Sequence, residues 1–259
     1  MERVSTQRET VQVRGIPVCY EVAGQGEPLV MVHGFAESTR VWYRNLPELS
    51  EHYRVYLVDL PGFGSMRRFH RHFRLAELGA WLDSWRQAVG LEEIALVGHS
   101  MGGYIAMAMA AERPEKVKHL ALVDSLGAPL QRSVVRLMGP ALKAIARATP
   151  SPWLAMSYDS LRAGPLTLWR VSRQIVTLDT SAVLAAVNVP TLLIWGENDD
   201  LLPFDLGRQL HTHLSQARLC VIQGANHFCM YEQPDLFNQT LLAFLRDQHV
   251  GVEVKLNAE

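Results

Sequence analysis

The sequence has few cysteines and no excess of charge of one sign. Its three cysteines, Cys19, Cys220 and Cys229, are an odd number without the spacing of metal ligands. This pattern favours buried, reduced thiols over a disulfide framework or a metal site. The formal net charge is -1, so no overall field would attract nucleic acid or a membrane surface.

Long apolar runs are absent as well. No stretch approaches the roughly 18 to 20 apolar residues that span a bilayer, and residues 1–14 lack the apolar segment of a secretory signal. The sequence therefore predicts a cytoplasmic protein, a monomer or homodimer, that binds neither nucleic acid nor membranes. Hydrophobic residues still make up 48% of the 259 residues, which is enough for a sizeable core.

Short apolar runs alternate with helical patterns along most of the chain. A hairpin that turns at Gly15 is expected first, followed by strands at 29–32, 54–58, 94–97, 117–123, 191–195 and 218–222. Helical periodicity appears at 75–89, 206–214 and 234–247. Apolar strands separated by helices indicate an α/β fold with a mostly parallel central sheet and helices on both faces.

Residues 125–180 interrupt this alternation. The segment has no clear strand, contains five prolines and predicts three or four helices. An insertion of this kind tends to cover the carboxyl ends of the strands. We therefore expect a core formed by residues 1–124 and 181–248, a helical cap or lid at 125–180 after the sixth strand, and a flexible tail at 249–259.

The most informative motif places a serine between glycines. Ser100 lies in the run Gly-His-Ser-Met-Gly-Gly at 98–103, between an apolar run and an alanine-rich helical run. A sharp strand-to-helix turn would expose its hydroxyl and needs small neighbours. The backbone N–H groups that follow could stabilise a developing negative charge. Ser100 is therefore the candidate nucleophile.

A serine nucleophile needs a base and a group that orients the base. The candidate base is His227, in the loop after the last expected strand, and the candidate acid is Asp199, after the preceding strand. Both follow the carboxyl ends of strands, where open α/β sheets form their sites. Asp200, Glu197 and Asp124 are the alternatives for the acid.

These motifs resemble the α/β-hydrolase superfamily over about residues 10–248. The resemblance rests on five motifs in order: His-Gly-Phe at 33–35, Asp-Leu-Pro-Gly-Phe-Gly at 59–64, the serine motif at 98–103, Gly-Glu-Asn-Asp at 196–199 and Gly-Ala-Asn-His at 224–227. It implies a catalytic triad of Ser100, His227 and Asp199. It also implies an oxyanion hole formed by the backbone N–H groups of Phe35 and Met101.

Three further residues near these motifs are expected to have structural roles. His33 would order the oxyanion loop, Asp59 would brace neighbouring loops through backbone hydrogen bonds, and His99 would pack beside the nucleophile.

The resemblance favours a serine esterase that needs no metal or organic cofactor. The expected substrates are small carboxylic esters with a short-to-medium acyl or aryl group, hydrolysed through an acyl-enzyme. C–C bond hydrolases of ring-cleavage products usually carry Asn and Trp in place of His99 and Phe228. Lactonases and thioesterases could use the same triad, and a ligand receptor or pseudoenzyme is the alternative that is not an enzyme.

The cap is expected to form the substrate pocket. Its apolar candidates are Met138, Trp153 and Met156, together with Phe228 beside the catalytic histidine.

Two basic clusters have no assigned role. One is the run at 67–74, and the other consists of the cap residues Arg132, Arg136, Lys143, Arg147, Arg162, Arg170 and Arg173. Solvated helix faces would account for them, and so would recognition of an anionic substrate or an acidic carrier protein.

Overall fold

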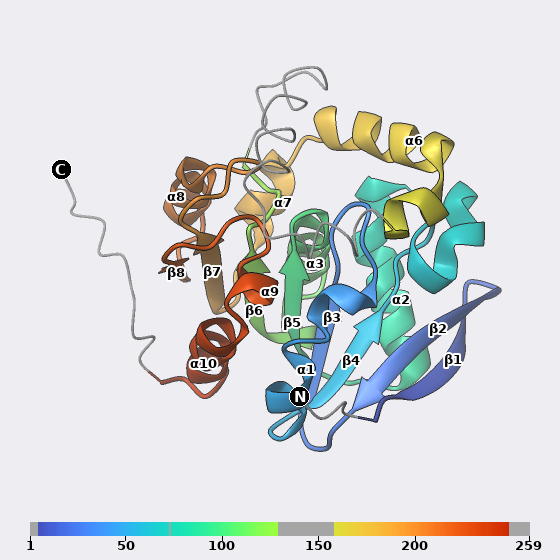
Figure 1. Ribbon diagram of the computed structural model, residues 1–259, viewed down its shortest axis with the longest axis horizontal. Helices are drawn as coiled ribbons and strands as arrows, with labels where there is room; N and C mark the ends of the chain where they lie inside the picture. Colours follow the sequence, from blue (N-terminus) through green and yellow to red (C-terminus); the bar gives the residue numbers. More distant parts are fainter. Residues whose placement is uncertain (1–4, 73, 129–157, 249–259) are drawn as a thin grey trace.

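An eight-stranded sheet forms the centre of the molecule (Figure 1). The computed structural model describes residues 5–72, 74–128 and 158–248. The order of the strands across the sheet is β1-β2-β4-β3-β5-β6-β7-β8. The strands are β1 (Gln7–Val13), β2 (Ile16–Ala23), β3 (Pro28–Val32), β4 (Arg54–Val58), β5 (Ile94–His99), β6 (Val117–Val123), β7 (Thr191–Gly196) and β8 (Ala217–Ile222).

The direction of the strands places the carboxyl ends of most of them at one edge. β1 and β2 form an antiparallel hairpin, and β2 pairs antiparallel with β4. All pairs from β4 through β8 are parallel. β3 lies between β4 and β5, so the chain order reverses at this position. Ligand sites of open α/β sheets form at such a reversal.

Helices cover both faces of the sheet (Figure 1). Alternate residues of each parallel strand point to opposite faces: Val30 and Val32 join one apolar core, whereas Leu29 and Met31 join the other. The first core includes side chains of α2 (Leu78–Val89), α3 (Met101–Glu112), α7 (Ser181–Ala186) and α8 (Phe204–His213). The second includes side chains of α1 (Leu46–Ser50), α9 (Cys229–Glu232) and α10 (Pro234–Leu245).

The expected α/β class and order of elements are confirmed, with differences at the ends. The helix expected at 75–89 begins with a 3-10 turn, η3 (Leu75–Glu77), before α2. The basic run at 67–74 lies largely in a 3-10 segment, η2 (Gly64–His72). Shorter 3-10 turns are η1 (Thr39–Trp42) and η4 (Pro114–Lys116). The hairpin strands are longer than expected because backbone pairing continues through their polar residues, as in the pair Gln7 and Val22.

Two helices lie in the described part of the segment expected to form a cap, and this segment contacts the core. They are a helix at 158–163 and α6 (Pro165–Val176), which stands over η2 (Figure 1). The hydroxyl of Ser38 donates to Asp159 Oδ2 at 2.6 Å, and the backbone N–H of Leu75 donates to Gln174 Oε1 at 2.8 Å. The domain boundaries stay a prediction, since 129–157 and 249–259 lie outside the described residues. None of the described helices is long and apolar enough to cross a membrane.

Candidate active site

Ser100 occupies the sharp turn between β5 and α3. Its backbone angles are φ 51° and ψ -117°, a conformation that costs a residue with a side chain about 1–3 kcal/mol. Two hydrogen bonds maintain it: the N–H of Ser100 donates to the carbonyl of Val123 at 2.9 Å, and the N–H of Leu126 donates to the carbonyl of Ser100 at 3.0 Å. The neighbouring strand thus supports the strained backbone at the candidate nucleophile.

Two glycines allow the loop after β3 to lie against this turn. A Cβ on Gly34 would lie 3.0 Å from Cβ of Ser100, so the loop passes directly beside the nucleophile. A Cβ on Gly102 would collide with the backbone oxygen of His33 and lie 2.5 Å from that of Val32. Only glycine permits this approach of β3 and α3.

The expected oxyanion-hole donors belong to these same two segments. Met101 is the first residue of α3, so its N–H has no partner within the helix. Phe35 follows Gly34 in the loop beside Ser100. Their role in binding an oxyanion stays a prediction.

The loops after β7 and β8 bring the candidate acid and base together. His227 Nδ1 lies 2.7 Å from Asp199 Oδ2, and both residues are buried. Asp199 Oδ1 accepts the backbone N–H groups of Leu201 and Leu202, each at 2.8 Å. The carboxylate is therefore held in place, and it favours the tautomer with hydrogen on Nδ1 and a free lone pair on Nε2.

The surroundings of His227 favour its protonated form. Burial opposes the charge, but the carboxyl groups of Asp199, Asp124 and Glu37 together raise the pKa of His227 to about 9. Among the described residues, no hydrogen bond joins the Ser100 hydroxyl to His227. Such contacts are often loose before a substrate binds.

His99 connects the nucleophile turn to the loop of the base. Its Nε2 lies 2.9 Å from the carbonyl oxygen of His227, and its Nδ1 lies 3.0 Å from Glu37 Oε2. The rings of His99 and His227 are 4.8 Å apart. Because Ser100 follows His99 directly, this contact keeps the base beside the nucleophile.

Glu37 is the buried carboxyl partner of His99. Burial would raise the pKa of Glu37, but His99, with His33 and the N–H of Gly34, holds that pKa below its usual value. The surroundings of Glu37 therefore favour its carboxylate form. Glu37 Oε2 also accepts the N–H of Gly34 at 2.8 Å, which ties the oxyanion loop to the same pair.

His33 and Asp59 form the expected loop contacts. His33 Nε2 accepts the N–H of Leu60 at 3.0 Å, while its Nδ1 lies 2.8 Å from the carbonyl oxygen of Gly34. Asp59 accepts the N–H groups of Thr39 at 2.9 Å and Ser65 at 2.7 Å.

Asp124 is a second buried carboxyl group close to the acid. It follows β6 in a left-handed conformation with φ 41°, and its Oδ1 accepts the N–H of Gly196 at 2.7 Å. Burial and the charge of Asp199 raise its pKa well above the usual value. Asp124 makes no hydrogen bond to His227 within the described part of the chain, which favours Asp199 as the orienting acid.

The residues expected in the substrate pocket are placed only in part. Phe228 is 2% exposed and packs against the rings of His99 and His227, so it supports the base; its contact with a substrate stays a prediction. Met138, Trp153 and Met156 lie outside the described residues. Sequence reasoning missed Glu37, whose only signal was an acidic residue two positions after the His-Gly-Phe motif.

Within the described residues, no group of three or more His, Cys, Asp or Glu side chains is arranged to hold a metal ion. The polar groups of the site instead bind one another, in an arrangement suited to proton transfer and nucleophilic attack.

The chain belongs to the α/β-hydrolase family, because the profile of the alpha/beta hydrolase fold matches residues 27–176. It is 28% identical to a 2-hydroxy-6-oxo-6-phenylhexa-2,4-dienoate hydrolase of Comamonas testosteroni, over 88% of this chain and 91% of that protein. It is also 37% identical to a (lyso)-N-acylphosphatidylethanolamine lipase of Mus musculus, over 56% of this chain and 41% of that protein.

Solved structures of other proteins also share this fold. A bacterial membrane phospholipase A superposes with a TM-score of 0.81 at 26% identity, over 93% of this chain and 86% of that one. The carboxylesterase CesB of Bacillus subtilis superposes with a TM-score of 0.75 at 19% identity, over 95% of this chain and 93% of that one, and shows the fold alone. The relatives are thus hydrolases of several kinds.

Proposed function

We propose that the protein is a serine hydrolase that cleaves small carboxylic esters through an acyl-enzyme on Ser100. The observation that carries this proposal is the buried hydrogen bond of 2.7 Å between Asp199 and His227. It leaves Nε2 of His227 free to act as a base at the carboxyl edge of the sheet, where the strained turn presents Ser100.

In the proposed mechanism, the hydroxyl oxygen of Ser100 attacks the ester carbonyl while His227 Nε2 takes its proton. The tetrahedral oxyanion accepts hydrogen bonds from the N–H groups of Phe35 and Met101, each worth about 3 kcal/mol in the transition state. His227 then returns the proton to the leaving alcohol. Water, activated by the same base, hydrolyses the acyl-enzyme and releases the acid.

Hydrolysis of a C–C bond is the second candidate, because the Comamonas relative is named for this chemistry. His99 and Phe228 depart from the Asn and Trp typical of that group. In this protein His99 also makes two hydrogen bonds, to Glu37 and to the carbonyl of His227. Both ring nitrogens of His99 are therefore engaged in contacts that position Glu37 and the loop of His227. The departure from Asn and Trp supports hydrolysis of an ester over hydrolysis of a C–C bond. Lactones and thioesters remain possible acyl substrates of the same triad.

A fluorophosphonate probe and p-nitrophenyl esters of increasing acyl length test the proposal. We expect the wild-type protein to be labelled and to hydrolyse the shorter esters, and Ser100→Ala to do neither. If the wild-type protein is neither labelled nor active on any ester, it is not an esterase. Labelling that survives Ser100→Ala would exclude this serine as the nucleophile. Faster turnover of a dienoate ring-cleavage product than of any ester would favour the second candidate.

A further inference from the structure

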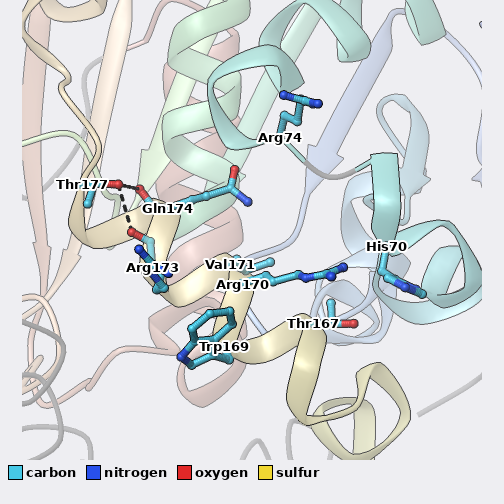
Figure 2. Close-up of a pocket in the computed structure, with 9 residues that line it drawn as sticks. All are labelled: His70, Arg74, Thr167, Trp169, Arg170, Val171, Arg173, Gln174 and Thr177. Carbon is cyan, nitrogen blue, oxygen red and sulfur yellow. Dashed lines mark hydrogen bonds between the residues drawn. The ribbon is translucent and has the colours of Figure 1, made fainter.

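The fold brings described residues of the two basic clusters together around one groove. A groove of about 450 Å³ lies between α6 on one side and His70 and Arg74 on the other, and Figure 2 shows its lining residues. His70 and Arg74 come from the first cluster, whereas Arg170 and Arg173 come from the second. Basic residues from two segments far apart in the sequence thus line one concave surface, which is an arrangement suited to an anionic ligand.

The residues that line this groove include positively charged side chains but no negatively charged one. The nine lining residues, all described, include three arginines and no carboxylate. Outside the lining, the exposed carboxylate of Glu77 lies 3.9 Å from Arg74. Asp159 of the cap faces the core instead, where its carboxylate contacts Ser38 and Arg40. The potential of the groove therefore attracts anions.

An aromatic side chain and further donors border the same groove. Trp169 is 56% exposed, and the guanidinium of Arg173 lies 5.1 Å from the centre of its ring. Gln174 uses its Oε1 to accept the N–H of Leu75, which leaves its amide hydrogens for another acceptor. Exposed tryptophan beside fixed donors is typical of sites that bind a planar or apolar group attached to an anion.

We propose that this groove binds a small organic anion. Arg170 and Arg173 bind its carboxylate or phosphate group, and Trp169 contacts its apolar part. The anion has two chemical sources: the acidic end of an ester substrate, or a separate ligand that is not hydrolysed. Only the first source rests on the proposed ester hydrolysis.

Binding of phenyl phosphate, measured by titration calorimetry, tests the groove without any turnover. We expect saturable binding to the wild-type protein and to Ser100→Ala. Loss of both charges in Arg170→Gln/Arg173→Gln should weaken it by about tenfold or more. Arg208→Gln is the matched control, because the Arg208 guanidinium lies 5.1 Å from the ring of Phe204 on α8, away from the groove. Equal affinity in the double variant and the control, or no saturable binding to the wild type, would overturn the proposal.

Trp169→Ala separates the two parts of the ligand. It should weaken binding of phenyl phosphate but not of inorganic phosphate, and an equal loss for both would remove the aromatic contact from the proposal. All three side chains are exposed, so the unfolding temperature of each variant should match the wild type.

Kinetics distinguish the two sources of the anion. If the groove holds the acidic end of a substrate, Arg170→Gln/Arg173→Gln will raise KM for p-nitrophenyl hemisuccinate but not for p-nitrophenyl butyrate. If both esters are unaffected while phenyl phosphate binding is lost, the groove belongs to a separate ligand. If the proposed ester hydrolysis is wrong, the wild-type protein will hydrolyse neither ester. The binding of phenyl phosphate measured by calorimetry would not be affected by that result.

Discussion

His99 joins three segments that carry proposed catalytic groups. Through Glu37 it reaches the N–H of Gly34 in the oxyanion loop, and through the carbonyl of His227 it reaches the base. Ser100 follows it in the chain. A change in the contact between Glu37 and His99 should therefore alter the relative positions of the catalytic groups while leaving the groups themselves intact.

Glu37→Gln tests this positioning role. We expect kcat for a neutral ester to fall by about tenfold to hundredfold, with little change in KM, because small displacements of reacting groups are costly. Glu21→Gln is a matched control, since Glu21 is a buried acid hydrogen-bonded to Tyr43 and outside the catalytic segments. A purely structural effect would lower stability in both variants and leave kcat unchanged in both.

Asp199 and Asp124 can be told apart by the same kind of substitution. Asp199→Asn removes the acceptor of the His227 Nδ1 hydrogen, so we expect kcat to fall by about 10³- to 10⁴-fold. Asp124→Asn keeps an acceptor for the N–H of Gly196, so kcat should fall by less than about tenfold. Equal losses of kcat in the two variants would make Asp124 part of the catalytic unit.

The raised pKa of His227 predicts an alkaline rise in activity. The base accepts the Ser100 proton only when it is neutral, and its pKa is raised to about 9. We therefore expect kcat/KM for a neutral ester to increase with pH until it levels above about pH 9. Rates are measured against Ser100→Ala to subtract background hydrolysis. A plateau already reached at about pH 7 would show that the charges around His227 do not act as described.

The strand β3 and its loop pass close to the start of α3. A side chain on Gly102 would collide with backbone oxygens of β3 and the loop, and backbone cannot move away as a flexible side chain would. We therefore expect the geometry of the proposed site to depend on this contact between a strand and a helix as well as on the proposed triad.

Gly102→Ala should move the start of α3 away from β3 and the loop that follows it. We expect the free energy of unfolding to fall by about 1–3 kcal/mol and kcat to fall by more than about hundredfold, measured by denaturant unfolding and by ester hydrolysis. Ala111→Ser, at the other end of α3, should change neither. Full activity in Gly102→Ala would mean that the oxyanion loop is not positioned by this contact.

Charge is nearly balanced over the whole molecule but not within the groove. Because the net charge is -1, long-range attraction should contribute little to the binding of a neutral substrate. The arginines that line the groove act locally, over about 10 Å at moderate ionic strength.

Salt should therefore separate the two kinds of ligand. From about 50 mM to about 500 mM sodium chloride, we expect kcat/KM for p-nitrophenyl butyrate to change less than about twofold, while phenyl phosphate binding weakens markedly. If salt weakens ester hydrolysis and phenyl phosphate binding to the same extent, the effect of salt comes from the overall charge of the protein or from a change in folding, and not from the groove.

Most of the architecture could be predicted from local pattern. Apolar runs and helical periodicity located the parallel strands and most helices, because these signals lie within short segments. The glycines next to Ser100 indicated the strained turn, because this signal also lies within a short segment. The ends of helices such as α2 were less accurate, since a 3-10 turn and an α-helix share the same apolar spacing there.

The sequence by itself determined the fold class, the family resemblance and the candidate triad, because their signals are local motifs in a particular order. Only the tertiary structure decided which acid meets His227, how Glu37 and His99 join the loops around Ser100, and that basic residues from two distant segments line one groove. These are contacts between segments far apart in the chain, and they form only when the sheet brings the carboxyl ends of its strands and the segments beside them together.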